Sequence, residues 1–340
     1  MRIASQDFSP ADAKGVAISK NGVQGRLPGL MRRLAPLIVL LALCIGLGLI
    51  SPNFFSVNNF ARIASASAIP VVLTLGATFV ILLGSIDLSV EGVMALAGVV
   101  LASMVAADSS WLSSVLGVIA AITIGAAMGA FSGLLHVILR IPSFMVTLGM
   151  WFIGLGIATL MVGGGTIAIR EAAVRGFALE RFAGLPFTVW IALAALFVAW
   201  VVQNHTRLGR HIYALGGGED IAVLSGVSVL RTKLLVFAMA GAFYGLGAVL
   251  AAAQLGQGNA DIGTGRLFTT ITAVVVGGTS LLGGQGGVVQ SLIGVLIVSV
   301  LANGMVLLGI PPYLQQAFLG LMIIGAVAYA TRRTRFKIVK

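Results

Sequence analysis

The acidic residues Asp87 and Glu91 stand in a Gly- and Ser-flanked break between two long apolar stretches of the chain. Their spacing places both carboxylates on one face if the stretch is helical. A carboxylate inside a membrane is costly and indicates a functional role by default. The structural alternative is that an acidic side chain here stabilises the N-terminus of the following helix. We favour this capping role for Asp87 and single out Glu91, which would lie one turn deeper.

Other chemistry-bearing patterns fail on spacing. The glycine string at 283–287 does not belong to a complete phosphate-binding loop, since neither G-x-x-x-x-G-K-[ST] nor G-x-G-x-x-G after a strand occurs. His136, His205 and His211 are not at metal-ligand spacing with carboxylates. No Ser/His/Asp arrangement can be argued. We therefore expect no catalytic residue, no metal, no cofactor and no ATP site in this chain.

The polar segment 204–233 carries a second set of candidate residues. A run of glycines at 216–218 is followed by Glu219 and Asp220, and acidic residues suit the first turn of a helix. Apolar residues then recur near helical spacing up to Gly226, which is a plausible stop. Lys and Arg are absent between Arg210 and Arg231, which argues against a helix lying on lipid. We expect a short exposed helix that binds a protein partner.

The elements that position these residues follow from composition. Of 340 residues 59% are hydrophobic and only 9% are charged, whereas soluble domains carry roughly 25% charged residues. Apolar runs of such length indicate membrane spans, and in hydrocarbon the backbone satisfies its hydrogen bonds as helix. The sequence predicts an all-α integral membrane protein. The apolar segments are 34–50, 62–83, 86–107, 111–139, 143–163, 187–203, 233–255, 267–282, 288–309 and 313–330.

The distribution of positive charge sets the expected orientation. The net charge is +11, which in a soluble protein would suggest nucleic acid, but basic residues of membrane proteins gather on the cytoplasmic side. With ten spans and both termini cytoplasmic, 16 of the 21 Lys and Arg residues lie on that side. We expect a disordered cytoplasmic tail over 1–30, a polytopic membrane domain over 31–332 and a basic cytoplasmic tail over 333–340. No nucleic-acid partner is expected.

Glycine spacing predicts close helix contacts. Gly125, Gly129 and Gly133 lie four apart, and Gly241 and Gly245 repeat the spacing. Small residues at this interval let helix backbones approach closely, so we interpret both sets as packing faces. The strings 84–92 and 277–287 are a weaker internal echo, since each precedes an apolar helix. Matching interruptions of this kind occur in transporters with duplicated halves, and the echo leaves a duplication open.

Several colinear strings resemble the permease subunit of ribose-type (carbohydrate uptake class 2) ABC importers. They are Gly84–Gly98, Ile141–Gly149, Thr206–Lys233, Ala260–Gly265, Ala273–Gly287, Asn303–Gly309 and Leu314–Gly320. The resemblance implies an ABC importer permease fold in the bacterial inner membrane, without enzymatic activity of its own. It also implies three partners: a cytoplasmic ABC ATPase, a periplasmic sugar-binding protein and a second permease copy in a homodimer.

The resemblance further implies that a coupling loop at about 206–232 contacts the ATPase. The residues that it assigns to this contact are Gly217, Gly218, Glu219, Asp220, Ala222, Leu224, Ser225, Gly226 and Val227. The candidate translocation path is formed by polar residues that lie at breaks between spans or within spans. Its residues are Ser85, Asp87, Glu91, Gln254, Asn259 and Asn303.

The expected cargo is a monosaccharide of the ribose type. Two departures from the family pattern lie where a path could run: Glu91 stands where glycine is usual, and Arg266 opens a stretch that is usually acidic. They leave a nucleoside, a furanose autoinducer, a polyol or a branched-chain amino acid as alternatives. A different class of protein, an ion-coupled secondary transporter, would use Asp87 and Glu91 as a relay.

One further prediction concerns the segment 164–186 on the expected periplasmic side. It carries Arg170, Arg175 and Arg181 together with two glutamates. We expect these charges to help dock the binding protein through charge pairs. The alternative is a solvated loop without a partner.

Overall fold

The computed structural model describes residues 26–108, 110–311, 313–315, 317–318, 320–322, 324–325 and 328. The chain divides into two units, residues 1–35 and 36–340. What is described of the first unit is the start of the first helix. The tails expected at 1–30 and 333–340 lie wholly or largely outside the described residues, and so does much of the last predicted span.

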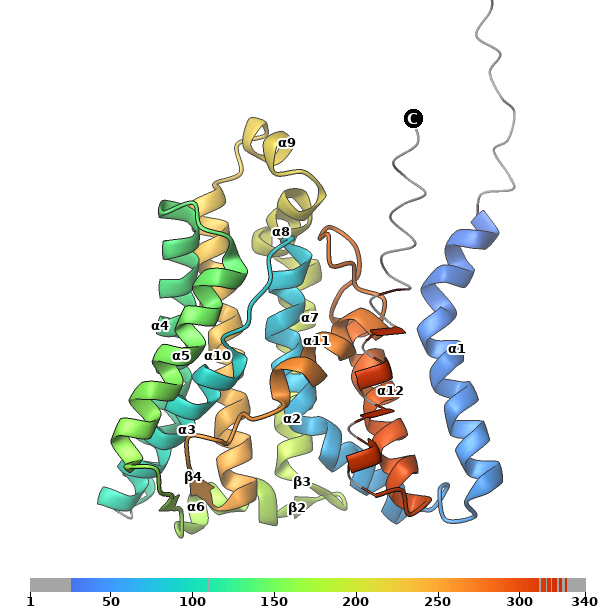
Figure 1. The fold of residues 1–340 in the computed structure, drawn as a ribbon, viewed down its shortest axis with the longest axis vertical. Coiled ribbons are helices and arrows are strands. Elements are labelled where there is room, and N and C mark those ends of the chain that lie inside the picture. Colours follow the sequence, from blue (N-terminus) through green and yellow to red (C-terminus); the bar gives the residue numbers. More distant parts are fainter. Residues whose placement is uncertain are drawn as a thin grey trace, which may run out of the picture. The chain divides into compact units, whose positions relative to one another are not determined.

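The described chain is built almost entirely of helices (Figure 1). The helices are α1 (Arg26–Ile50), α2 (Val57–Leu82), α3 (Val90–Ala107), α4 (Trp111–Ile138), α5 (Ser143–Val162), α6 (Ala172–Leu179), α7 (Phe187–His205), α8 (Arg207–Gly217), α9 (Glu219–Leu224), α10 (Val229–Leu255), α11 (Arg266–Val276) and α12 (Val288–Leu307). The strands are β1 (Ile167–Ala168), β2 (Arg181–Phe182), β3 (Leu185–Pro186) and β4 (Gln257–Gly258). β1 pairs antiparallel with β4, and β2 pairs antiparallel with β3.

Seven helices of the described part are long and apolar enough to cross a membrane, namely α2, α3, α4, α5, α7, α10 and α12. They confirm the predicted all-α membrane fold. The prediction of a span at 267–282 was wrong in length, because α11 has 11 residues. At 1.5 Å per residue it is about 16 Å long, roughly half of the ~30 Å hydrocarbon core.

The two ends of the helix bundle differ in what they carry. The short helices α8 and α9 lie at one end, and α6 with the β2–β3 hairpin lies at the other (Figure 1). We call these the α9 end and the α6 end. α2 runs from the α6 end to the α9 end, and α10 runs back from the α9 end to the α6 end (Figure 1).

The glycine spacing predicted to bring helices together does so between α4 and α10. A Cβ atom at Gly125 would overlap the carbonyl oxygen of Gly241, and one at Gly129 would overlap that of Phe237. The same holds at Gly245, against the backbone of Ala121. Backbone contact at this distance is possible only without side chains, and it confirms the interpretation as a packing face.

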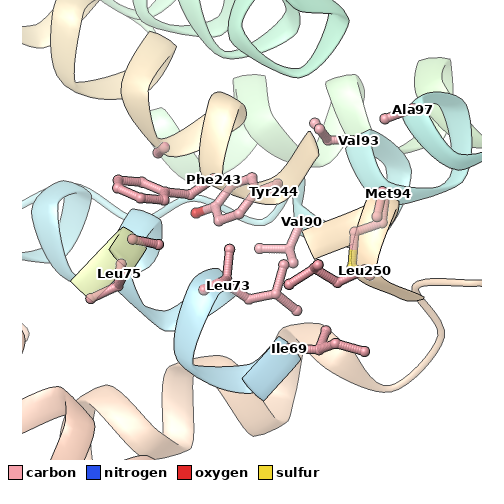
Figure 2. Close-up of a cluster of buried hydrophobic side chains, with 14 of the residues drawn as sticks. Ile69, Leu73, Leu75, Val90, Val93, Met94, Ala97, Phe243, Tyr244 and Leu250 are labelled. Atoms are coloured by element: carbon pink, nitrogen blue, oxygen red, sulfur yellow. The ribbon is translucent and has the colours of Figure 1, made fainter. Parts of the chain in front are cut away.

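Side chains of α2, α3 and α10 form the centre of the largest apolar cluster. Leu73 of α2, Val90 and Met94 of α3, and Tyr244 of α10 are all fully buried. Figure 2 shows them packed together, with the Tyr244 ring lying beside Phe243. Since lipid is as apolar as these residues, van der Waals packing rather than burial from water holds the helices together.

Candidate functional site

The break between α2 and α3 enters the bundle as an extended segment. The Ile86 amide donates to Ser143 Oγ at 3.0 Å, and the Leu88 amide donates to Thr147 Oγ1 at 2.9 Å. Both acceptors belong to the first turns of α5. The segment therefore runs along α5 from its start toward its middle.

The first turn of α3 lies deep between other helices as a result. A Cβ atom at Gly92 would overlap the backbone of Trp151, and one at Gly154 would overlap the backbone of Gly92. Trp151 follows the start of α5 by eight residues, which corresponds to about 12 Å of helix. α3 thus begins well inside the bundle and not at its surface.

A second break, residues 256–265 between α10 and α11, runs along α3 from the α6 end. A Cβ atom at Gly258 would lie 2.5 Å from that of Ala102, and one at Gly263 would lie 2.8 Å from the Cα atom of Glu91. The chain then begins α11 beside the start of α3. Two helices that are remote in sequence therefore have their N-termini together inside the bundle.

Glu91 joins these two N-termini directly. Its Oε1 atom accepts a hydrogen bond from the Leu267 amide at 3.1 Å, and the side chain is buried, with 9% exposed. The N-cap residue of α11 is Gly265, which has no side chain to supply this bond. Glu91 thus caps a helix that lies 176 residues further along the chain.

Asp87 does not cap α3, because the N-cap residue of that helix is Ser89 and no side chain accepts from the amides of its first turn. Its Oδ1 atom accepts from the Ser89 amide at 2.9 Å and from Ser89 Oγ at 2.6 Å. The side chain is buried, with 4% exposed, and Tyr244 lies beside it. These bonds form an Asx-type turn that orders the residues just before α3.

The remaining residues of the predicted path are dispersed. Ser85 is buried near the α9 end, Gln254 is exposed in the last turn of α10, and the Asn303 amide donates to Asn59 Oδ1 at 3.0 Å. Asn259 lies in the second break, and its buried Oδ1 atom has no hydrogen-bond partner among the described residues. The structure therefore places Ser85 and Asp87 in the first break, Glu91 in the first turn of α3 and Asn259 in the second break, whereas Gln254 and Asn303 lie elsewhere.

The predicted partner-binding helix is present as α9, with apolar side chains directed outward. Ile221 is 72% exposed and Leu224 is 88% exposed, whereas Ala222 is buried. α9 begins at Glu219, as the run of glycines and acidic residues predicts, and the chain turns at Gly226, where φ is 82°.

Glu219 forms an ion pair that could not be predicted from local sequence patterns. Its Oε2 atom lies 2.8 Å from Lys233 Nζ, in the first turns of α10. The Lys233 side chain is 10% exposed and that of Glu219 is 49% exposed. This is the one ion pair among the described residues. The pair fastens the start of α9 to a helix that extends through the bundle.

A cavity of about 300 Å³ lies beside this pair. Its lining comes from the break before α3, the end of α4, the start of α5 and the Glu219–Lys233 pair. The lining residues are Leu83, Gly84, Ser85, Ile86, His136, Pro142, Ser143, Phe144, Glu219 and Lys233. The α9 contact and the first break therefore share one small polar space.

α8 is packed tightly onto two other loops at the α9 end. A Cβ atom at Gly216 would overlap the Leu82 carbonyl oxygen, and the Gly284 amide donates to that same oxygen at 2.9 Å. Gly283 approaches Gly84 equally closely. The strings 84–92 and 277–287, noted as an internal echo, thus meet through their glycines under α8.

A side-chain hydrogen bond reinforces this contact. Tyr213 Oη of α8 donates to the Gly286 carbonyl oxygen at 2.7 Å. Burial raises the pKa of the Tyr213 phenol, so the hydroxyl remains protonated and able to donate. Through Tyr213 and the glycines, α8 is connected both to the loop after α11 and to the end of α2.

Arg175 makes hydrogen bonds within the chain at the α6 end. Its Nη1 atom donates to the carbonyl oxygens of Ala253 at 2.6 Å and Gln254 at 3.2 Å. A cation at the C-terminal carbonyls of α10 is a stabilising cap. Arg170 and Arg181 are exposed at the α6 end, and docking of a binding protein by this segment stays a prediction.

Metal ligands do not gather in the part of the chain that the structure describes. No three His, Cys, Asp or Glu side chains there come close enough to hold an ion. The arrangement instead consists of the starts of α3 and α11, which the Glu91 carboxylate joins inside the bundle, and of the exposed apolar helix α9. Packed loops connect α9 to these helix starts.

Comparison with known proteins gives consistent results. The family described as "Branched-chain amino acid transport system / permease component" matches residues 59–327. The ribose import permease protein RbsC of Escherichia coli (strain K12) is 38% identical over 266 residues, which cover 77% of this chain and 82% of that protein. RbsC of Bacillus subtilis (strain 168) is 34% identical, covering 79% and 84%. The D-allose transport system permease protein AlsC of E. coli K12 is 34% identical, covering 74% and 77%. No solved structure matches the chain significantly.

Proposed function

The chain belongs to the family of transport-system permease components, and from this premise we propose that it is the membrane-spanning subunit of an ABC importer for a monosaccharide. The observation that carries the proposal is the identity with ribose import permeases over most of both chains. Such a permease is a transport subunit and not an enzyme. It obtains its energy from a separate ATPase subunit, and a separate substrate-binding protein delivers the cargo.

The ATPase binds, in this proposal, at α9. Ile221, Val223 and Leu224 present exposed apolar side chains on a helix of 6 residues, which is too short to cross a bilayer. α9 and its neighbours contain the residues assigned to coupling from the sequence. The α9 end is then cytoplasmic and the α6 end is periplasmic, in agreement with the distribution of basic residues along the sequence.

The cargo passes along the face formed by the two breaks. Irregular backbone at membrane depth is tolerated only where protein covers it or where it lines a water-filled cavity. Residues 256–265 are irregular, and Asp261 and Thr264 in this stretch are exposed. Discontinuous helices of this kind commonly border the substrate path of transporters. We infer that a second copy of the chain covers this face, with the path between the two copies.

Movement at α9 reaches the path through the packed loops. ATP-dependent closure of the ATPase displaces α9, and the Glu219–Lys233 pair transmits this displacement to α10. The contacts of α8 transmit it to the end of α2 and to the loop after α11. Both routes lead to the helices that begin inside the bundle, so the path opens and closes with the state of the ATPase.

The cargo that relatives are named for is ribose, D-allose or galactose. We propose a monosaccharide for this chain as well. The relatives named for sugars favour a monosaccharide over a branched-chain amino acid. The family and the exposed α9 favour an ATP-driven importer over the ion-coupled transporter.

ATP hydrolysis by the assembled complex tests the proposal. The permease is purified with its ATPase, and hydrolysis is measured with the binding protein loaded with ribose, allose, galactose, a nucleoside or leucine. We expect one monosaccharide to stimulate hydrolysis strongly. Stimulation only by the nucleoside or by leucine would reject the cargo class, and a lack of association with any ATPase would reject the function.

A further inference from the structure

Glu91 is the one acidic side chain of the described residues that links two interior helix starts. It lies in the first turn of α3 and accepts from the Leu267 amide in the first turn of α11. Gly263, just before α11, approaches the Glu91 backbone at a distance that leaves no room for a side chain. The start of α11 therefore contacts Glu91 twice, through the Gly263 backbone against the Glu91 backbone and through the Leu267 amide at the carboxylate.

The carboxylate of Glu91 accepts from a backbone amide and forms no ion pair among the described residues. Among the described residues the only ion pair is Glu219–Lys233, at the α9 end. The N-terminus of a helix carries a partial positive charge, and two such ends converge at Glu91. A carboxylate in the interior of a bilayer is otherwise costly.

α11 depends on this carboxylate for its cap. Gly265, at the N-cap position, has φ of 77° and no side chain that could accept from the following amides. Leu267 is buried, with 2% exposed, so solvent does not supply an acceptor for its amide while Glu91 is in place. Without Glu91 the Leu267 amide would be a buried donor without a partner, which destabilises the start of α11.

The same place borders the face along which we propose that cargo passes. Thr264 and Gly265 are exposed immediately before α11, and Phe268 is 59% exposed in its first turn. Half-helix N-termini at this depth hold the anionic groups of cargo in other transporters. In this chain the side chain of Glu91 already lies there.

We propose that Glu91 is a positioning and specificity-determining residue. It holds the starts of α3 and α11 together, and its negative charge neutralises helix ends that would otherwise attract anions. Neutral polyhydroxy molecules therefore pass, whereas sugar acids and phosphorylated sugars are excluded. The first part rests on the observed contact alone, and the second part rests on the proposed function.

Thermal unfolding of the purified permease tests the first part without any partner. Glu91→Gln keeps an oxygen acceptor for the Leu267 amide, and Glu91→Ala removes it. We expect a clear loss of stability for Glu91→Ala and a small loss for Glu91→Gln. Acetate, used as a probe carboxylate, should raise the midpoint of Glu91→Ala more than that of the wild type, in comparison with chloride at equal ionic strength. Wild-type stability of Glu91→Ala, or equal effects of acetate and chloride, would overturn the positioning role.

Inhibition by a sugar acid tests the second part in the reconstituted complex. The binding protein is saturated with neutral sugar, and an aldonate that it does not bind is added at increasing concentration. We expect the inhibition constant of the aldonate to fall roughly 2- to 30-fold in Glu91→Ala relative to wild type, the range for an anion at a helix N-terminus. Asp261→Ala is the matched control, since this exposed acidic residue lies in the same break. The specificity role would be overturned if the inhibition constant fell equally in Glu91→Ala and Asp261→Ala, or if it fell in neither variant. A wild-type complex without ATP-driven uptake would instead reject the proposed function, and the unfolding experiment would still decide on the contact.

Discussion

The Glu219–Lys233 pair gives the sharpest prediction, because its two members differ so much in exposure. The Lys233 side chain is 10% exposed and cannot regain water without moving α9, whereas that of Glu219 is 49% exposed. Removing one partner of a fully buried pair costs about 3–5 kcal/mol, and breaking an exposed pair costs less than about 1 kcal/mol. For this half-exposed pair we expect about 1.5–3 kcal/mol, the range for a hydrogen bond to a charged group.

The perturbation is Glu219→Gln, with Asp220→Asn as the matched control. Asp220 is the neighbouring acidic residue, it is exposed, and it forms no ion pair among the described residues. We expect Glu219→Gln to lower the free energy of unfolding by about 1.5–3 kcal/mol. A tenfold change in an equilibrium corresponds to about 1.4 kcal/mol, so this loss is large enough to reduce ATP-driven uptake. Asp220→Asn should change stability by much less.

A double-mutant cycle separates the ion pair from other effects of the glutamate. Lys233→Met removes the buried charge and keeps an unbranched side chain of similar reach. Because an apolar replacement of both partners often restores stability, the double variant should be more stable than Glu219→Gln alone and should remain poor in uptake. The reasoning would be refuted if the stability lost in the double variant equalled the sum of the losses in the two single variants. Wild-type uptake in the double variant would also refute it.

Three other changes test separate parts of the account. Gly129→Leu should abolish folding or strongly lower the unfolding midpoint measured in detergent, because its side chain would overlap the Phe237 carbonyl; Gly156→Leu, where nothing lies within 4 Å, is the control and should be tolerated. Leu224→Asp should weaken association with the ATPase in a pull-down without changing the thermal stability of the permease, since this side chain is 88% exposed; loss of stability would contradict a purely external role. Tyr213→Phe, which removes the bond to Gly286, should cost about 0.5–1.5 kcal/mol of stability in thermal unfolding and lower the uptake per ATP hydrolysed; unchanged values of both would contradict the role of α8.

Much of the fold could be predicted from the sequence because a bilayer leaves the backbone few options. Apolar runs such as 111–139 and 143–163 became α4 and α5 with nearly the predicted bounds. The glycine spacing on α4 and α10 is a local pattern, and it correctly predicted a close packing face. The prediction of a span at 267–282 was wrong because the apolar residues continue past Val276, whereas α11 ends there before two glycines.

The contacts within the candidate site could not be predicted in the same way. The exposed helix at 219–224 follows from a glycine run and two acidic residues, which are local signals. The bond from Leu267 to Glu91 joins residues 176 apart, and the glycines at 84, 216 and 283 meet only in the folded chain. A signal for the first contact was available: an acidic residue at a helix start, and a later helix preceded by glycine alone. The count of basic residues assigns Lys233 to the cytoplasmic side. No local pattern in the sequence indicates that its side chain is buried, as the structure shows.

The central claim is that this chain supplies the path and that an ATPase bound at α9 supplies the energy. Uptake of labelled sugar into proteoliposomes tests it most directly, with the permease and binding protein present and the ATPase either added or left out. We predict uptake only with the ATPase and ATP, and its loss when α9 carries Leu224→Asp. Sustained concentrative uptake without the ATPase would contradict the account.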